Sequence, residues 1–176
     1  MTIRTETQTR PTDIALRPWS EGDLPLLERL LGNPQMTEHL GGPESSEQLR
    51  RRHLRYLGTA GTETGTMFVI TVGPEELAAG SVGYWEHEWR GETVWETGWT
   101  VLPEFQGRGI ATRGTILAVE RATAEGRHGS IHAFPAVANG PSNAICRNVG
   151  FTLLGEADFE YPKGSYMRCN DWALDL

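Results

Sequence analysis

The segment from Val101 to Thr112 combines glycines with a change from strand to helix in a way that can bind an anion. A predicted strand ends near Leu102, and a predicted helix begins at Gly109, two residues after Gly107. The first backbone N–H groups of a helix have no partner inside the helix and point outwards. Glycine lets an anion approach the backbone closely, and the helix dipole favours negative charge at that end. The sequence therefore predicts a phosphate-binding turn.

Two common phosphate-binding loops do not fit this turn. A Walker loop needs a lysine and then a serine or threonine after its second glycine, but Ile110 and Ala111 stand there. The dinucleotide-binding fingerprint needs a third glycine or an alanine where Thr112 stands. The glycines at 107 and 109 taken alone also fit a tightly packed turn that binds nothing. A simple packing turn therefore stays open as an alternative. A dinucleotide site also stays open, although the turn matches its fingerprint only at the two glycines.

The wider spacing Gln106-x-x-Gly109-x-Ala111 is more specific than the glycines alone. It resembles the (Arg/Gln)-x-x-Gly-x-(Gly/Ala) motif with which the GNAT superfamily of N-acetyltransferases binds pyrophosphate. Two further motifs follow the superfamily's order. They are Asn139-Gly140-Pro141-Ser142 followed by Gly150-Phe151, and Glu96-Thr97-Gly98-Trp99 followed by Pro103-Glu104-Phe105. The last of these is similar to a stretch of the ribosomal-protein N-terminal acetyltransferase branch, and the order of elements agrees over about residues 13–176.

The resemblance implies acetyl-CoA as the acetyl donor and assigns residues to hold it. The pantetheine arm would pair like an extra strand with the end of the preceding strand, where that strand and the next parallel one splay apart. Asn139 matches a position that contacts the pantetheine or the substrate, and Ser142 lies one helical turn further on. The residues so assigned are Val101 and Leu102 for the pantetheine, and Gly107, Arg108, Gly109, Ile110 and Ala111 for the pyrophosphate, with Gln106 and Thr112 beside them. No metal site is expected.

Glu96 is the candidate general base for the implied reaction, in which an amine attacks a thioester. Acceptor amines arrive mostly protonated at neutral pH, because their pKa values are about 8 for an α-amino group and about 10.4 for lysine. They therefore need a base. Glu96 is an acidic residue on an otherwise apolar predicted strand, where burial would raise its pKa toward neutrality. Alternatively Glu96 pairs with an arginine or lies on an exposed edge, and Glu86, His87 and Glu88 are then the reserve candidates.

Ser142 is the second candidate catalytic residue, as a proton donor to the departing thiolate. Its hydroxyl could equally bond the backbone early in the helix. Many superfamily members have a tyrosine where this chain has Cys146, four residues before Gly150, so this departure weakens any acid role at that position. Free cysteines are often core residues, and we expect Cys146 to be a buried packing thiol.

The elements that must position these residues follow from changes in hydrophobic period. Helices are predicted from Ser20, with Asp23 completing a cap, after residue 45 or 46, over 109–126 and over 141–149. Strands are predicted over 14–19, 66–73, 79–89, 92–102, 130–134, 151–161 and 165–176, with a hairpin turn at Arg90-Gly91. A strand, turn, helix and strand in succession make a crossover whose two strands are parallel. The prediction is an α/β fold: a mixed, mostly antiparallel sheet of six or seven strands, helices on both faces and one splayed parallel pair.

Two residue patterns have alternative interpretations. Arg50, Arg51, Arg52 and Arg55 lie away from the apolar side of their predicted helix, and we interpret them as a solvated face, with a partner-binding patch as the alternative. Tryptophans at 85, 89, 95 and 99 recur at period two on paired strands. Most of them are expected to pack across strands, and one or two to line the acceptor site.

Length and composition set the limits. The chain has 176 residues and a net charge of −7, which fits one acidic globular domain over 13–176 and a loose tail over 1–12. The acidic balance argues against nucleic-acid binding. No apolar run approaches a membrane span and the N-terminus lacks an apolar signal segment, so no membrane contact is expected. Two cysteines are too few for a disulfide framework, and a cytoplasmic location is the default.

The combined expectation is an acetyl-CoA-dependent N-acetyltransferase that acts on a primary amine by direct attack on the thioester. The acceptor is either the N-terminus of a protein or a small cationic amine, and its site is expected between residues 33–44, the second helix and the last two strands. The resemblance leaves a homodimer open. A GNAT-like module that holds CoA as a sensor or scaffold without turnover is the alternative from another class.

Overall fold

The computed structural model describes residues 13–176 as one seven-stranded sheet with four α-helices. The predicted tail over 1–12 lies outside the described residues. The strand order is β1-β2-β3-β4-β5-β7-β6, and only β4 and β5 pair in parallel among the described strands, so the predicted mixed sheet is confirmed. The strands are β1 (Ile14–Pro18), β2 (Gly65–Val72), β3 (Leu77–Trp89), β4 (Glu92–Val101), β5 (Ser130–Ala133), β6 (Thr152–Glu160) and β7 (Tyr166–Asp175).

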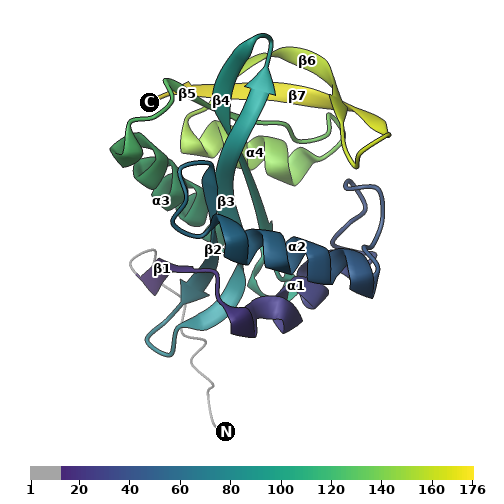
Figure 1. The fold of residues 1–176 in the computed structure, drawn as a ribbon, viewed down its shortest axis with the longest axis vertical. Coiled ribbons are helices and arrows are strands. Elements are labelled where there is room, and N and C mark those ends of the chain that lie inside the picture. The colour runs from purple at the N-terminus through teal and green to yellow at the C-terminus, as the bar shows by residue number, and fades with distance from the viewer. Residues whose placement is uncertain (1–12) are drawn as a thin grey trace, which may run out of the picture.

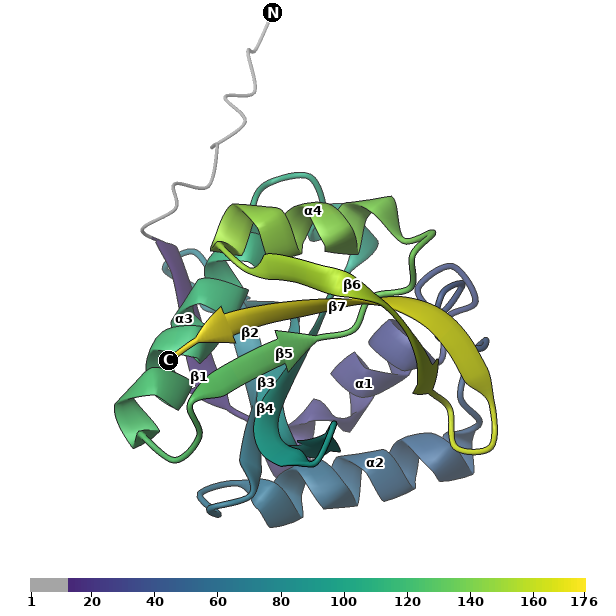
Figure 2. The same cartoon turned by 90° about the horizontal axis from the view of Figure 1, so that it is seen from above.

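Helices cover both faces of the sheet (Figures 1 and 2). On one face α1 and α2 bury Leu27, Leu30 and Leu49 against side chains of β2 such as Val69. On the other face α3 and α4 pack on a core that includes the fully buried Trp95. The helices are α1 (Leu24–Leu31), α2 (Ser46–Thr59), α3 (Ile110–Glu125) and α4 (Gly140–Val149). Among residues 13–176, no helix has the length and apolar character that crossing a bilayer takes.

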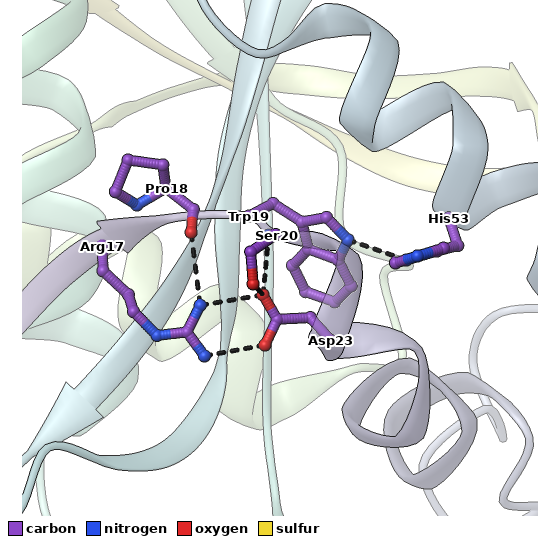
Figure 3. A network of polar contacts seen from close by, with 6 residues as sticks. All are labelled: Arg17, Pro18, Trp19, Ser20, Asp23 and His53. Carbon is purple, nitrogen blue, oxygen red and sulfur yellow. Dashed lines mark hydrogen bonds and ion pairs between the residues drawn. The ribbon is translucent and has the colours of Figure 1, made fainter.

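The first helix begins later than predicted, because Glu21–Asp23 form a 3-10 turn ahead of Leu24. The buried Asp23 carboxylate accepts two hydrogen bonds from the Arg17 guanidinium, at 2.8 and 2.7 Å (Figure 3). It also accepts from the backbone N–H and hydroxyl of Ser20, at 2.7 and 2.8 Å, which confirms the predicted pairing of Ser20 with Asp23. These bonds fix Asp23 in the turn, and they hold its pKa below the ordinary value although burial alone would raise it.

Trp19 joins the N-terminal strand to α2. Its buried indole N–H donates to His53 Nδ1 at 3.0 Å (Figure 3), and its ring meets Tyr56 edge-on with centroids 5.3 Å apart. Both partners lie on the inner side of α2, as their spacing predicts. This contact sets the position of α2 relative to β1, and α2 in turn supplies part of the pocket described below.

The parallel pair separates soon after it forms. Strands β4 and β5 are paired only at Trp95 with Ile131 and at Glu96 with His132, although β4 continues to Val101. The Leu102 amide donates to the Ala79 carbonyl on the β3 side at 2.8 Å. Because backbone groups alternate along a strand, those of residues 97, 99 and 101 face the opened side toward β5. The predicted splay is thus present, and Glu96 stands at its vertex.

Candidate active site

The turn of residues 106–112 presents a row of free backbone amides. Helix α3 begins at Ile110, and its cap Gly109 has φ +72°, while Gly107 has φ +73°. Within the part of the chain that the structure describes, no hydrogen bond comes from the amides of residues 107–112, and the first bonded amide is that of Arg113. Six adjacent donors at a helix N-terminus suit a diphosphate.

The two glycines are required by backbone conformation and not by crowding. A Cβ at either Gly107 or Gly109 would meet no atom within 4 Å. Their positive φ angles, however, fall in the left-handed region that other residues seldom adopt. The open space above them is also what a close ligand needs, so the predicted phosphate turn fits a pyrophosphate group.

Gln106 anchors the turn to the sheet. Its side-chain amide donates to the Val101 carbonyl at 2.9 Å, which fixes the distance between the end of β4 and the row of amides. The exposed Arg108 lies over the Phe105 ring, with 5.9 Å between the guanidinium carbon and the ring centroid, and adds positive charge beside the amides. Gln106 therefore shapes the turn, and Arg108 lies on the solvent side of it, while their predicted contacts with the pyrophosphate stay predictions.

The two residues predicted at the pantetheine, Val101 and Leu102, differ in whether their backbone groups are available for hydrogen bonding. The backbone of Val101 faces the splay, although Gln106 occupies its carbonyl. Leu102 is 1% exposed, its amide donates to Ala79, and its carbonyl accepts from the Phe105 amide at 2.9 Å. Of the two, Val101 keeps a free N–H for pairing, whereas Leu102 contributes only as a packed neighbour.

Glu96 lies in the wall of a pocket on the opened side of β4. Its side chain is 14% exposed, and burial raises its pKa to about 7, with the indole of its cross-strand partner Trp85 acting in the opposite direction. The pocket, called the Glu96 pocket below, is lined by Leu31, His39, Leu40, Arg52, Tyr56, Met67, Ser81, Trp85, Glu96, Thr97, Gly98, Trp99, Thr100, Ala133, Phe134, Pro135, Ala136, Asn139, Ser142, Phe159, Tyr161 and Met167.

The surroundings of Glu96 distinguish between the predicted alternatives. Within the described residues no arginine pairs with it, and its charged-group neighbour is His87, whose Nδ1 lies 3.4 Å from Glu96 Oε2. Burial lowers the pKa of His87, and the nearby His132 lowers it further. The reserve candidate Glu86 instead faces His128, 3.0 Å away, and Glu88 bonds the Thr93 hydroxyl. Glu96 is therefore the acidic residue that reaches the pocket.

Asn139 and Ser142 lie together at the start of α4. The Asn139 side-chain oxygen accepts from the Ser142 backbone amide at 3.2 Å and so caps the helix. Both residues line the Glu96 pocket. No hydrogen bond of the Ser142 hydroxyl to another described residue is found, so this hydroxyl is not engaged by the backbone, which had been the alternative. The structure thus brings both residues to the same pocket as Glu96.

Cys146 lies on the inner side of α4 and is 0% exposed. Burial raises the pKa of its thiol to about 12, so the thiol stays protonated at neutral pH. It packs in the core shared by α3, α4 and the sheet and does not line the Glu96 pocket. The predicted packing role is consistent with this position.

Three polar arrangements that shape the site were not found from the sequence. Arg52, predicted on the solvated side of α2, instead turns into the pocket wall, where it bonds Glu44 and donates to the Tyr161 hydroxyl at 3.0 Å. Its exposed neighbours Arg50, Arg51 and Arg55 do face solvent as predicted. Arg52 departs from that pattern because the partners come from residues 8 and 109 positions away, which no local period reveals.

The other two arrangements lie behind the pocket and join β5, β7 and α4. Asn143 accepts from the Trp172 indole and the Asn170 side chain, both at 2.8 Å, and so ties α4 to β7. His132 Nδ1 lies 2.7 Å from Asp171 Oδ1, and Trp89 Nε1 donates to Asp171 Oδ2 at 2.9 Å. Within residues 13–176, no group of three or more His, Cys, Asp or Glu side chains is arranged to hold a metal ion.

Comparison with known proteins identifies the family of this chain. A family model described as an acetyltransferase (GNAT) domain matches residues 13–152. No curated protein matches the sequence.

Three solved structures illustrate the shared fold. The acetyl transferase from Salmonella typhimurium that modifies the N-terminal serine of ribosomal protein L7/L12 is 23% identical with a TM-score of 0.75, covering 94% of this chain and 96% of that one. The spermidine N-acetyltransferase from Vibrio cholerae, in complex with CoA and spermine, is 20% identical with a TM-score of 0.76, covering 93% and 96%. An aminoglycoside acetyltransferase in complex with coenzyme A is 17% identical with a TM-score of 0.77, covering 92% and 94%.

Proposed function

Because this chain belongs to the GNAT acetyltransferase domain family, we propose that it transfers the acetyl group of acetyl-CoA to a primary amine. The observation that carries the proposal is that β4 leads from one feature to the other: the buried carboxyl of Glu96 lies midway along the strand, and the free amides of the 106–112 turn follow its end. The three neighbours named above support it, since each is named for an acceptor that carries amines. The proposed domain spans residues 13–176, because β6 and β7 complete both the sheet and the pocket.

The 106–112 turn would hold the pyrophosphate of the acetyl donor. Its amides donate to phosphate oxygens, and the N-terminus of α3 and Arg108 add favourable potential. The N–H of Val101 faces the splay and can pair with an amide of the pantetheine arm, which directs the thioester toward Glu96. Backbone groups carry most of this binding, so it depends on conformation more than on side-chain identity.

Glu96 would act on the acceptor amine. With a pKa of about 7, roughly half of its carboxyl groups are ionised at neutral pH, and the ionised form can take a proton from the incoming ammonium group. The freed nitrogen forms a bond to the thioester carbonyl carbon, and the bond from that carbon to sulfur breaks. The nitrogen must then lose a second proton to become an amide, while the departing thiolate gains one. The free hydroxyl of Ser142 is our candidate for this transfer, giving its own proton to the thiolate and taking back the one that the nitrogen loses. A thiol of pKa about 8.5 leaves readily, so this second step needs little assistance.

The proposal is tested by measuring thiol release and product mass with acetyl-CoA and a panel of primary amines and peptides with free N-termini. We expect thiol release that depends on the amine, together with a product heavier by one acetyl group. A CoA-binding module without turnover would be protected by CoA against heat but release no thiol with any acceptor. Protection by a nicotinamide dinucleotide without protection by CoA would support the dinucleotide alternative and refute the assignment of the 106–112 turn.

A further inference from the structure

The charges in the wall of the Glu96 pocket limit what the acceptor can carry. Among the described residues that line the pocket, Glu96 is the one carboxylate. The other fully charged lining residue, Arg52, is matched by Glu44, with its Nε donating to Glu44 Oε2 at 3.0 Å and a second nitrogen bonding the other oxygen. Both side chains of this pair are less than one-fifth exposed. The pocket therefore offers a place for one ammonium group, beside Glu96, and no carboxylate that could receive a second.

The remaining surface of the pocket is rich in aromatic side chains. Six of them line it: Tyr56, Trp85, Trp99, Phe134, Phe159 and Tyr161. Phe134 and Phe159 stack on each other with centroids 4.6 Å apart, and Trp85 and Trp99 are only partly buried by the protein itself. Partly exposed aromatic faces in a concave site gain free energy when an apolar body covers them.

One side of the pocket is built by segments that are distant in sequence. Arg52 on α2 donates to the Tyr161 hydroxyl at 3.0 Å, and a Cβ at Gly41 would lie 2.9 Å from Pro162 Cδ. Residues 33–44 therefore lie against the turn between β6 and β7. These contacts limit the room beside Glu96, part of which the acetyl arm would fill, and so favour a small acceptor.

From these three observations we infer that the acceptor is a small primary monoamine whose single ammonium group is attached to an aromatic or similarly apolar body. This inference rests on the proposed function, since it names the substrate class of the same site. A polyamine or an aminoglycoside would have to place additional ammonium groups against aromatic rings without a carboxylate partner. The attraction of a ring face for a cation offsets only part of the cost of burying an unpaired charge.

The test compares arylalkyl monoamines such as 2-phenylethylamine and tryptamine with spermidine and kanamycin. Thiol release with acetyl-CoA should give a kcat/KM at least about 100-fold higher for the monoamines. Binding of the same amines to the CoA-loaded protein, measured by calorimetry, should show the same order without any need for turnover. If the monoamines bind but no acceptor is acetylated, the substrate inference stands and the proposed function fails. If spermidine or kanamycin is the better ligand and substrate, the inference is overturned while the proposed function stands.

A matched pair of variants tests whether the missing second carboxylate sets the amine preference. Met167 lies on β7 in the wall of the Glu96 pocket and is partly exposed, so a polar replacement should be tolerated. Met167→Glu supplies the second carboxylate, and Met167→Gln has nearly the same shape without the charge. We expect Met167→Glu, and not Met167→Gln, to lower the preference for monoamines over spermidine by about 10-fold or more. Equal preferences in the two variants would contradict the view that missing carboxylates exclude polycations.

Discussion

The 106–112 turn and the Glu96 pocket are neighbours at the end of β4, yet they are built in opposite ways. The turn consists of consecutive residues and offers backbone amides held by two glycines with positive φ angles. The pocket draws side chains from residues 31 to 167, and its properties come from which of them meet. A backbone-built site tolerates sequence change as long as its conformation is kept, whereas a site built from side chains changes its ligand with single substitutions.

Glu96→Gln should have the largest effect, because it changes catalysis in the pocket while leaving CoA binding at the turn intact. We expect kcat to fall by about 10²- to 10⁴-fold, because the variant cannot accept a proton from the amine. The wild-type rate should rise with pH through an inflection near 7, where Glu96 ionises, and the variant should lack that inflection. Steady-state kinetics from pH 5.5 to 9 measure both effects. The affinity for CoA should stay unchanged, and a parallel loss of CoA binding would show that the two regions are not independent.

Glu96→Gln should lower activity but raise the stability of the folded protein. Burial raises the pKa of Glu96 from 4.5 to about 7, so the folded state disfavours its ionised form. Below pH 4.5 the carboxyl is protonated in both states and no stability is lost. As the pH rises from about 4.5 to about 7 the unfolded chain ionises first, which lowers the free energy of unfolding by up to about 3 kcal/mol.

Glu96→Gln has no carboxyl to ionise and should therefore be more stable than the wild type at pH 8, with the difference vanishing near pH 4.5. Urea unfolding of both proteins at the same series of pH values measures it. A constant difference across that range would mean that Glu96 titrates normally, and the case for a tuned base would be lost.

The reciprocal experiment alters the turn and leaves the pocket intact. Gly109→Ala forces a Cβ into the left-handed region at the N-terminus of α3 and crowds the space over the free amides, so CoA affinity should fall by about 10- to 100-fold. The matched control is Gly126→Ala at the other end of the same helix, where φ is +62° and the added Cβ is equally unobstructed. Both variants should lose about 1 kcal/mol of stability. Calorimetric titration with CoA should then show weaker binding to Gly109→Ala than to Gly126→Ala. Equal affinities of the two variants for CoA would show that the turn does not bind it.

The smallest effect is expected at the start of α4, where Ser142 lines the Glu96 pocket. Ser142→Ala removes the hydroxyl but keeps the backbone amide that Asn139 caps, so stability should hold. We expect kcat to fall by about 10-fold or less, since a thiolate leaves readily without strong acid catalysis. Asn139→Ala is the structural counterpart and should cost about 1 kcal/mol of stability through the lost cap. An unchanged kcat in Ser142→Ala would contradict a role for the hydroxyl in proton transfer.

Much of the fold and of the turn could be predicted from the sequence, because both depend on local features. Alternating hydrophobicity located the strands to within one or two residues, and the glycine spacing located the start of α3. The prediction failed at the start of α1, where Asp23 is captured by Arg17 in a 3-10 turn. That contact depends on where β1 runs relative to the turn, and the hydrophobic periodicity of a helix carries no information about that.

The pocket was predictable only in outline. Residues 33–44, α2, β6 and β7 were expected to surround the acceptor, and they do line the pocket together with Glu96. Its chemistry was not predictable, because the Arg52 side chain was expected in solvent and its partner Tyr161 is 109 residues away. The net charge of −7 also says little about the pocket, because Glu96 is the one carboxylate among the described residues that line it. Overall charge is a property of the surface, while specificity belongs to a few side chains brought together by folding.

The short junction of β4 with β5 has a mechanical consequence. Four strands on one side of the sheet and three on the other are joined through two residue pairs, and Glu96 belongs to the second of them. Backbone pairing therefore does little to hold the two halves of the sheet together at this point. The core that β4, β5 and β7 share there, through Trp95, Ile131 and Trp172, does most of it. The position of the Glu96 carboxyl relative to the β5–β7 side of the pocket thus depends on side-chain packing more than on strand pairing.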